Sequence, residues 1–294
     1  MLLWECGHCR LSEDRFPQVQ GDRLYPLELV DSGAWRGPDS ALTTETWYTG
    51  LVERYSGRQL TFEGDKMVAI GALAKATSWG RHIPYLAGLW GDSVRSGLMW
   101  RRNGPGSKCK TTTRPSWSWA SQSSPVSYMF SNLEFIINAE LRDGFKPQVV
   151  DARVEAADVK NPFADVKWGY VMLHTKLQMA RVLRDFLGRI PPRHNFITEE
   201  ARGLFIDSGT FMSQWPAAAY MDDEHVTHEV LVALVGWAGT FIALVLTPPR
   251  LDAEEYRRVG IAILDYYDWD WGTFREGLAD SQIMQWTTRT IKIV

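Results

Sequence analysis

The feature that most constrains the fold is a series of short, β-rich segments that fills the chain beyond residue 119. β-Branched and aromatic residues recur there in short runs bounded by turn-forming residues, a pattern typical of strands. The predicted strands are Val126–Phe130, Leu133–Leu141, Gln148–Glu155, Lys167–Leu173, Leu204–Ile206, Val259–Leu264 and Thr288–Val294, with a hairpin inside Val230–Leu246. Most connections are too short for parallel crossovers, so we expect an antiparallel β sandwich or barrel-like domain. Gln178–Leu187 has helical composition, and we expect this one helix to cover an open end of the domain.

The segment Val230–Leu246 has 17 residues without a charge, a length just below that of a membrane helix. Gly236 and Gly239 interrupt it in the middle, and β-branched residues dominate on either side. We therefore predict a buried hairpin whose turn is Gly-Trp-Ala-Gly, with a membrane span as the alternative.

The first third of the chain has helical periodicity. Trp47, Leu51 and Tyr55 fall on one stripe of a first helix, which we expect to end at Gly57. Asp65 is the predicted N-cap of a second helix that packs against the first. Two stripes are open for the buried face of this second helix, either Val68, Leu73 and Ala76 or Met67, Ile70 and Ala74.

A segment rich in glycine, proline and threonine separates these two regions. Gly104, Pro105 and Gly106 stand among lysines and threonines without an apolar period, which indicates a linker. The predicted organisation is thus α+β, with a helical region over residues 1–100, a linker over 101–115 and a β-rich domain over 116–294. The basic residues of the linker could contact phosphates, but no aromatic residues alternate with them, so we expect a solvated loop. They are Arg101, Arg102, Lys108, Lys110 and Arg114.

Charge and cysteine content limit the setting of the protein. The chain has 32 basic and 35 acidic side chains among 294 residues, and a net charge of −3 argues against nucleic acid as a partner. Three cysteines cannot form a disulfide framework. Glu5 follows Met1-Leu2-Leu3-Trp4 directly, too early for the apolar part of a secretory signal. We expect a reducing, cytoplasmic location.

The octapeptide Arg114–Ser121 reads Arg-Pro-Ser-Trp-Ser-Trp-Ala-Ser. Two tryptophans at spacing two behind a proline predict an extended strand with both rings on one face. Tryptophan supplies a large buried area and one N–H donor that needs a partner. We expect four tryptophans to be staples of the core and the domain interface, with a ligand-stacking role as the alternative. They are Trp90, Trp100, Trp117 and Trp119.

Several blocks along the chain resemble those of fungal heterokaryon incompatibility (HET) proteins. Leu3-Trp4-Glu5-Cys6 resembles the end of the HET domain, and the later blocks resemble, in the expected order, the region that follows that domain. These blocks are Trp47-Tyr48, Leu51–Ser56, Arg58 with Leu60-Thr61, Asp65-Lys66, Ala69 with Gly71–Ala74, Tyr85–Trp90, Leu98–Trp100 and Arg114–Ser121. The similarity is weaker in Asn161–Phe163, Tyr256–Gly260 and Thr290–Val294.

The resemblance implies a role in non-self recognition. In HET proteins an N-terminal domain similar to the TIR fold triggers cell death in incompatible fusions, and the opening motifs of that domain do not occur here. The resemblance therefore implies a non-enzymatic interaction or regulatory part, whose β domain is a scaffold or recognition surface. A protein partner or the missing N-terminal HET domain is the expected partner. A truncated paralogue, an incomplete gene model and a free-standing regulatory half remain open.

The polar residues near the two ends of the chain do not match the pattern of a known site. Cys6-Gly-His-Cys9 copies the active-site tetrapeptide of disulfide oxidoreductases, but only five residues precede it, so no upstream strand of that fold fits. Cys6, His8, Cys9 and Cys109 would form an irregular zinc set. Among the acidic residues near the C-terminus, Asp265, Asp268 and Asp270 lack the loop positions of a calcium-binding hand.

The densest polar cluster is Asp222–Glu229, which contains two histidines but neither zinc-protease pattern. We expect a charged loop that leads into the buried hairpin. A cryptic hydrolase or metal-dependent enzyme centred on this loop is the alternative function. No nucleophile elbow, phosphate-binding loop or dinucleotide fingerprint occurs in the sequence. We therefore predict no enzyme activity, no catalytic, cofactor-binding or metal-binding residues, and no cofactor.

Overall fold

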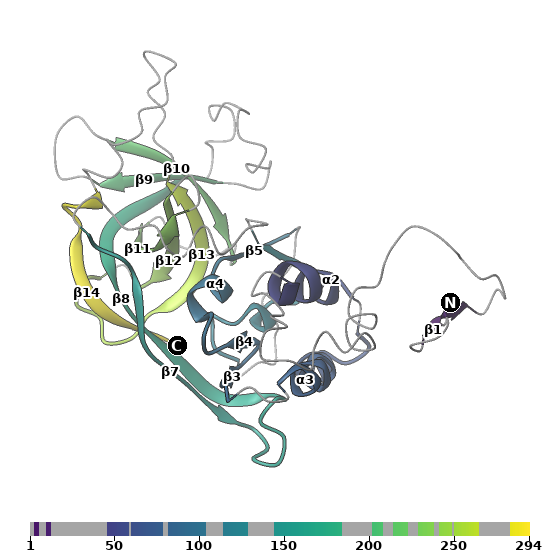
Figure 1. Cartoon of the computed structure of the whole chain (residues 1–294). Coiled ribbons are helices and arrows are strands. Elements are labelled where there is room, and N and C mark those ends of the chain that lie inside the picture. The colour runs from purple at the N-terminus through teal and green to yellow at the C-terminus, as the bar shows by residue number, and fades with distance from the viewer. Residues whose placement is uncertain are drawn as a thin grey trace.

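The chain folds into a large antiparallel sheet that closes on itself and a smaller helical region beside it (Figure 1). The computed structural model describes residues 3–5, 10–12, 46–58, 60–78, 82–103, 114–128, 144–183, 202–207, 214–222, 229–237, 241–248, 250–264 and 283–294. Most of the regular structure is strand and a smaller part is helix, so the predicted α+β class is confirmed.

The large sheet contains eight strands, all paired antiparallel. They are β7 Gln148–Ala156, β8 Val166–Leu183, β9 Arg202–Asp207, β10 Gln214–Met221, β11 Glu229–Trp237, β12 Phe241–Thr247, β13 Arg257–Leu264 and β14 Thr287–Ile293. The order β11-β12-β13-β10-β9-β8 returns to its start because β11 also pairs with β8. The sequence left a sandwich and a barrel-like domain open, and the structure has the closed, barrel-like arrangement.

Strand β8 connects this closed ring to a second, three-stranded part of the sheet. It is 18 residues long. Its C-terminal end pairs with β9 and β11 in the ring, whereas its N-terminal part pairs with β7 and β14. We call β7, β8 and β14 the ribbon. In Figure 1, β7 and the N-terminal part of β8 extend beneath the helical region, whereas β14 lies beside the ring.

The hairpin β11–β12 confirms the prediction for Val230–Leu246. Alternate residues of these strands enter two different hydrophobic clusters, so both faces of the hairpin are buried. A strand buried on both faces needs apolar residues at every position, which accounts for the run without charges. None of the helices in the described part of the chain has the length and apolar content that a membrane span requires.

The helical region combines short helices with two-stranded hairpins. Its elements are η1 Thr46–Val52, α2 Glu53–Ser56, α3 Asp65–Thr77, β3 Tyr85–Leu86, β4 Leu89–Trp90, α4 Val94–Gly97, β5 Trp100–Arg102, η2 Trp119–Ser121 and β6 Val126–Tyr128. A separate hairpin pairs β1 Leu3–Glu5 with β2 Arg10–Ser12. Residues 114–128 therefore belong with the helices, because β6 pairs with β5, and Trp119 of η2 contacts both Gly88 in the β3–β4 turn and Lys66 of α3.

Both predicted helices are present, with small differences in their ends. The first begins with a π-helical turn, and its Trp47 and Leu51 are buried as expected. In the second, Gly64 is the N-cap and Asp65 is the first helical residue. The buried stripe is Met67, Ile70 and Ala74, whereas Val68 is 49% exposed. The two helices contact through the Tyr55 hydroxyl, which donates to the Lys66 carbonyl at 2.7 Å.

Gly71 lies in the middle of α3, where glycine is ordinarily unfavourable. A Cβ atom at this position would lie 2.2 Å from the carbonyl oxygen of Phe163 in the turn between β7 and β8. The glycine therefore permits the backbone of α3 to approach the ribbon closely.

Two predictions about local structure were wrong, and one strand was not predicted. The octapeptide Arg114–Ser121 is not a strand; it contains a turn followed by the 3-10 helix η2. Gln178–Leu183 is not helical, because it forms the end of β8 and pairs there with β9 and β11, and residues 184–187 lie outside the described residues. Strand β10 was not predicted. Leu133–Leu141 also lies outside the described residues.

The predicted linker is ordered at both of its ends. Arg101 and Arg102 belong to β5, and the Arg101 guanidinium lies over the Tyr220 ring at 4.6 Å. Arg114 is buried. Residues 104–113, with Lys108 and Lys110, lie outside the described residues. The expectation of a solvated basic loop is thus wrong for these three arginines.

Candidate functional site

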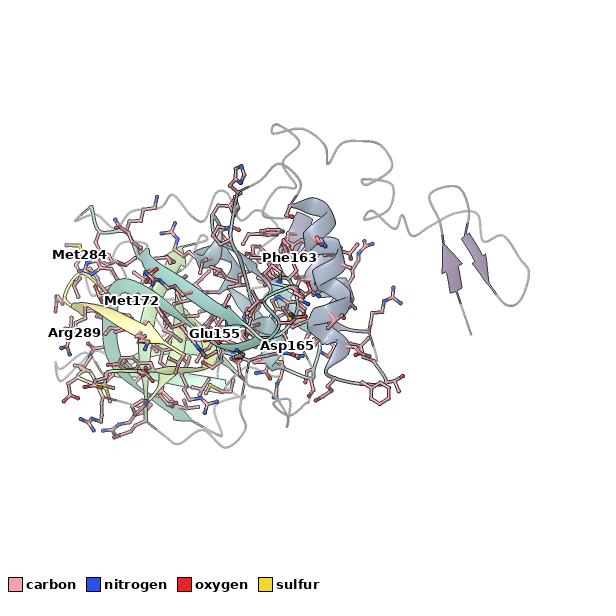
Figure 2. The ribbon with its side chains drawn as sticks, turned by 90° about the horizontal axis from the view of Figure 1, so that it is seen from below. Glu155, Phe163, Asp165, Met172, Met284 and Arg289 are labelled. Carbon is pink, nitrogen blue, oxygen red and sulfur yellow. The ribbon has the colours of Figure 1, made fainter. Side chains whose placement is uncertain are left out.

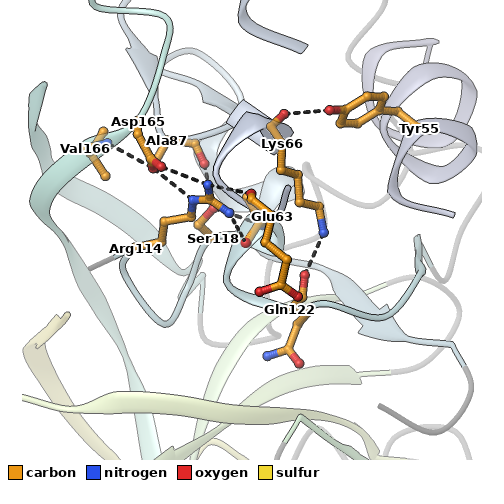
Figure 3. A network of polar contacts seen from close by, with 10 residues as sticks. Tyr55, Glu63, Lys66, Ala87, Arg114, Ser118, Gln122, Asp165 and Val166 are labelled. Carbon is orange, nitrogen blue, oxygen red and sulfur yellow. Dashed lines mark hydrogen bonds and ion pairs between the residues drawn. The ribbon is translucent and has the colours of Figure 1, made fainter. Parts of the chain in front are cut away.

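The octapeptide is the joint between the helical region and the large sheet. Arg114 donates from Nε and Nη2 to the two carboxylate oxygens of Asp165, each at 2.8 Å, one residue before β8 begins (Figure 3). Its remaining donors reach the carbonyl oxygens of Ala120 and Glu63 at 3.1 and 3.2 Å. A planar guanidinium suits such a two-pronged carboxylate contact. Arg114 therefore holds η2, the start of α3 and the start of β8 together, and does not present its charge to solvent.

The tryptophans of the octapeptide complete this joint. Trp100, Trp117 and Trp119 are fully buried, and Trp90 is nearly so, which confirms the prediction of core staples. The indole N–H groups of Trp119 and Trp47 both donate to the carbonyl oxygen of Gly88, each at 3.2 Å. Gly88 and Ala87 have φ of +99° and +46° in the two-residue turn between β3 and β4. Such a turn requires positive φ at both positions.

A second arginine joins the ring to the helical region at another point. Arg258 of β13 donates to Asp222 and to the carbonyl oxygens of Leu98 and Trp100, and its guanidinium lies 3.4 Å from the centroid of the Trp100 ring. Burial lowers the pKa of Arg258, and the neighbouring Asp222 carboxylate opposes this shift. The Arg258–Asp222 pair is fully buried, and in the other joint the Arg114 guanidinium is nearly so while Asp165 is 33% exposed. Both arginines are engaged by carboxylate and carbonyl oxygens, so we assign the two joints a structural role.

The polar cluster at Asp222–Glu229 does not converge in the described residues. Asp222 is buried and faces Arg258, whereas Glu229 is exposed at the start of β11. Residues 223–228 lie outside the described residues, as do Cys6, His8, Cys9, Cys109, Asp265, Asp268 and Asp270. Within the described ranges, no group of three or more histidine, cysteine, aspartate or glutamate side chains is placed to hold a metal ion.

The outer face of the ribbon is the surface with the features of a binding site. Four large side chains point outward at alternate positions of β8, and we call them the outer row: Trp168, Tyr170, Met172 and His174. Trp168 is 48% exposed, while its neighbours in the row are half-buried. Figure 2 shows Met172 and Glu155 along this ribbon, with Met284 beside its β14 end.

Three of the four side chains of the outer row, all except Met172, are fixed by hydrogen bonds across the strands. The Trp168 indole donates to Glu155 at 2.5 Å, and the Tyr170 hydroxyl donates to Asp151 at 2.7 Å. His174 Nδ1 lies 3.0 Å from the Thr290 hydroxyl. The Trp168 and Tyr170 rings are parallel within 5°, with centroids 6.2 Å apart. The row is therefore exposed and preorganised at the same time.

The charges around the outer row neutralise one another. Glu155 pairs with Lys167 at 2.8 Å, and Lys292 pairs with Glu255 at 2.6 Å while lying over the Tyr170 ring. Hydrogen bonds from Lys167 and Trp168 lower the pKa of Glu155. The hydrogen bond from Tyr170 lowers the pKa of Asp151 and raises that of the tyrosine. The face thus has aromatic and apolar groups within a balanced set of ion pairs.

Exposed apolar residues are concentrated on the same part of the molecule. Six large hydrophobic side chains of the described residues are more than a third exposed, and four of them lie in or beside the ribbon: Val150 in β7, Val159 in the β7–β8 turn, Trp168, and Met284 just before β14. The other two, Phe62 and Val68, lie in the helical region. The sequence predicted a strand at Lys167–Leu173, but not that one face of it is exposed. The alternation of Trp168, Tyr170, Met172 and His174 with smaller residues was the signal that could have revealed an exposed face.

Comparisons of the chain with protein-family models, with curated proteins and with solved structures found no match.

Proposed function

We propose that this chain is a non-enzymatic interaction part of a HET-type non-self recognition protein, and that it binds a protein partner through the outer face of the ribbon. The observation that supports the binding role most strongly is the outer row, where Trp168 is half exposed yet held by its hydrogen bond to Glu155. Tryptophan and tyrosine provide most of the binding energy in many protein interfaces. Side chains that are already ordered lose little entropy on binding.

The charge pattern supports a protein partner in preference to nucleic acid. A nucleic-acid surface needs an excess of basic residues that neutralise phosphates. On the ribbon, the basic residues Lys167 and Lys292 are paired with Glu155 and Glu255. An uncharged, apolar protein surface matches this face better. A cytoplasmic location is part of the proposal and rests on the low cysteine content.

The HET part of the proposal rests on the sequence blocks, and one structural observation supports it. The block with the highest specificity, Arg114–Ser121, forms the joint between the helical region and the large sheet. A rigid joint suits a scaffold that presents one surface to a partner. The alternative of an enzyme at Asp222–Glu229 is not favoured, because the Asp222 carboxylate is engaged by Arg258.

The binding role is tested with two double variants of similar size. Trp168→Ala with Met172→Ala removes the most exposed side chain of the outer row and one of its inner members. Phe62→Ala with Val68→Ala removes apolar groups of the helical region that are 68% and 49% exposed. Partners are identified by proximity labelling in fungal cells and then purified for calorimetric titration. We expect the first variant to weaken binding at least about tenfold, a loss of about 1.4 kcal/mol. Equal affinities of both variants and the wild type would contradict the binding face.

The HET role is tested separately by expressing the same proteins in strains that undergo incompatible fusion. Wild-type protein and the Phe62/Val68 variant should change the extent of cell death, and the Trp168/Met172 variant should not. If the face binds its partner but cell death is the same in all strains, the interaction role stands and the HET role is refuted.

A further inference from the structure

The free edge of the ribbon is the side of β7 that faces away from β8. β7 pairs with β8 and with no other described strand. Alternate residues of a strand direct their backbone N–H and C=O groups to opposite sides, so about half of these groups in β7 point away from β8. Within the described residues, no hydrogen bond from an element other than β8 reaches the backbone of Gln148–Ala156. None of its residues is buried either, so this edge is open.

The opposite edge of the ribbon is closed by the chain itself. The Tyr256 N–H donates to the Lys292 carbonyl, and the Tyr256 carbonyl accepts from the Val294 N–H, each at 2.8 Å. The Ser116 N–H donates to the Val294 carbonyl at 3.2 Å. These bonds cover the C-terminal half of β14, whereas β7 has no such cover among the described residues. β7 is therefore the edge at which the sheet can continue.

The middle of β7 has few of the features that prevent edge strands from pairing. Proteins protect such edges with lysine, proline, inward charges or bulges. β7 contains neither lysine nor proline. Its two bulges lie near its ends, between Val149 and Asp151 and between Glu155 and Ala156. The segment Asp151–Glu155 between them is regular, and its charged residues lie opposite the exposed outer row, not on the core side.

The charges of this segment match those of a second copy of the same strand. If two copies pair antiparallel about Ala152, Asp151 of each copy lies opposite Arg153 of the other, and opposite charges face each other twice. The Asp151–Arg153 contact within each chain, 3.2 Å long, is then exchanged for the same contact between chains. Pairing about Arg153 would place arginine opposite arginine and Asp151 opposite Glu155, which is unfavourable. Pairing of Arg153 with Glu155 would compete with the ion pair between Glu155 and Lys167 at 2.8 Å.

We propose that two copies of this chain associate by antiparallel pairing of β7 with β7, in the register centred on Ala152. Both copies use the same segment, so the association closes at a dimer. The two ribbons then form one sheet, with both outer rows on the same face and free for a partner. The contact is short, so the dimer is a weak one. The proposal does not depend on the binding role of the outer row, and its failure would leave that role unchanged.

The first experiment is sedimentation equilibrium from micromolar to millimolar protein, with charge reversals at the paired positions. We expect a monomer–dimer equilibrium for the wild type. Asp151→Arg and Arg153→Asp should each weaken it about tenfold or more, because both attractive contacts become repulsive. The double variant Asp151→Arg with Arg153→Asp restores opposite charges, and its dimer constant should lie within about threefold of the wild-type value.

The control variant is Asp252→Arg, which makes the same charge change at an exposed position outside β7. Its dimer constant should be that of the wild type. A wild-type protein that stays monomeric, or that forms aggregates larger than a dimer, would overturn the proposal. So would a dimer that the single reversals do not weaken or that the double variant does not restore.

The second experiment needs only the wild-type protein and decides the matter even if the variants do not fold. Hydrogen exchange is measured at a low and a high protein concentration. Amides within Asp151–Glu155 should exchange more slowly at the high concentration, whereas those of Thr287–Thr290 should be unchanged. Equal exchange of the β7 amides at both concentrations would overturn the proposal. Protection of β7 that requires a different protein would assign the edge to that protein and also overturn the dimer.

Discussion

Arg258 Nε lies 3.0 Å from Asp222 Oδ2, and neither side chain is exposed to solvent. The two residues lie on or beside neighbouring strands of the ring, since β13 pairs with β10. The same guanidinium donates to the Leu98 carbonyl at 2.7 Å, so one buried cation connects the ring to the helical region. A buried charge is tolerated only when its hydrogen bonds are complete. Loss of either partner of this ion pair should therefore destabilise the fold strongly.

We expect Arg258→Met to destabilise the protein by about 3–5 kcal/mol, because it leaves the Asp222 carboxylate buried without its cation. The measurement is the free energy of unfolding from urea titration. Arg250→Met is the control, because Arg250 pairs with Asp252 at 3.3 Å while both side chains are at least 66% exposed. An exposed pair contributes about 0–1 kcal/mol. If the two variants lost similar amounts of unfolding free energy, Arg258 would not have the structural role assigned to it.

Trp119→Ala should destabilise the protein by about 3–5 kcal/mol, because it empties a fully buried indole site. It also removes the N–H donor to the Gly88 carbonyl. Trp168→Ala is the matched control, and we expect it to cost only about 0.5–1.5 kcal/mol through its lost hydrogen bond. Thermal unfolding of both variants gives the comparison. An unchanged Tm for Trp119→Ala would refute its assignment as a core staple.

Gly88→Ala tests whether the turn between β3 and β4 limits the position of Trp119. The new Cβ would lie 2.4 Å from Trp119 Nε1, and φ is +99°. We expect backbone strain to lower the free energy of unfolding by about 1–3 kcal/mol. Overpacking against the indole should lower it by a further amount of about 1–3 kcal/mol.

Two other glycines separate these contributions. Gly144 has a φ of +77° and open space around the position of a Cβ. Gly144→Ala should therefore destabilise the protein only through backbone strain, by about 1–2 kcal/mol. At Gly64 the backbone is helical and the space is also open, so Gly64→Ala should be close to neutral. Equal losses at Gly88 and Gly144 would exclude a steric contribution from Trp119.

Glu53 should give the protein a pH dependence opposite to that of most paired carboxylates. Burial raises the pKa of Glu53, although its hydrogen bond from the Tyr128 N–H and the charge of Arg101 oppose the shift. The folded protein then holds this proton more tightly than the unfolded chain. The stability that this proton provides is present below the unfolded pKa and is lost as pH rises to the folded pKa.

Glu53→Gln removes this titration and keeps an oxygen that can accept from the Tyr128 N–H. Relative to wild type, we expect the variant to gain stability as pH rises through the acidic range, as measured by urea unfolding from about pH 4 to pH 7. The control is Glu155→Gln, because the pKa of Glu155 is lowered and its contribution is lost as pH falls. The two variants should therefore change the slope with pH in opposite directions, and equal slopes would contradict both assignments.

The sequence predicted those parts of the fold in which local pattern and tertiary environment agree. The charge-free run Val230–Leu246 indicated a buried hairpin, and β11–β12 is buried on both faces. Gln178–Leu183 has helical composition, yet these residues form a strand. Their backbone pairs with β11 and β9 in the closed ring, and this tertiary pairing overrides the local preference. Strand β10 was missed for a similar reason. Its Pro216 and the run Ala217–Ala219 are weak strand formers, and the strand depends on β9 and β13 on its two sides.

Burial was easier to predict than geometry at the tryptophans of the octapeptide. A large ring behind a proline is buried in either a strand or a turn, so the spacing of Trp117 and Trp119 could not distinguish the two. The turn depends on partners distant in sequence, such as Asp165 for Arg114 and Gly88 for Trp119. The candidate binding face depends partly on the same kind of information. Alternation along β8 indicates that the strand has two different faces, but the pairing of Trp168 with Glu155 of β7 and its exposure show which face is outward.

The length of β8 has a mechanical consequence. At about 3.3 Å per residue, its 18 residues form one continuous strand, about 60 Å long along its path, that belongs to both the ribbon and the ring. A partner that pulls on the outer row along the strand loads the hydrogen bonds to β9 and β11 in shear, where many bonds resist together. Force applied at the face is thus transmitted to the closed ring, and the ribbon cannot tear away alone while β8 remains intact.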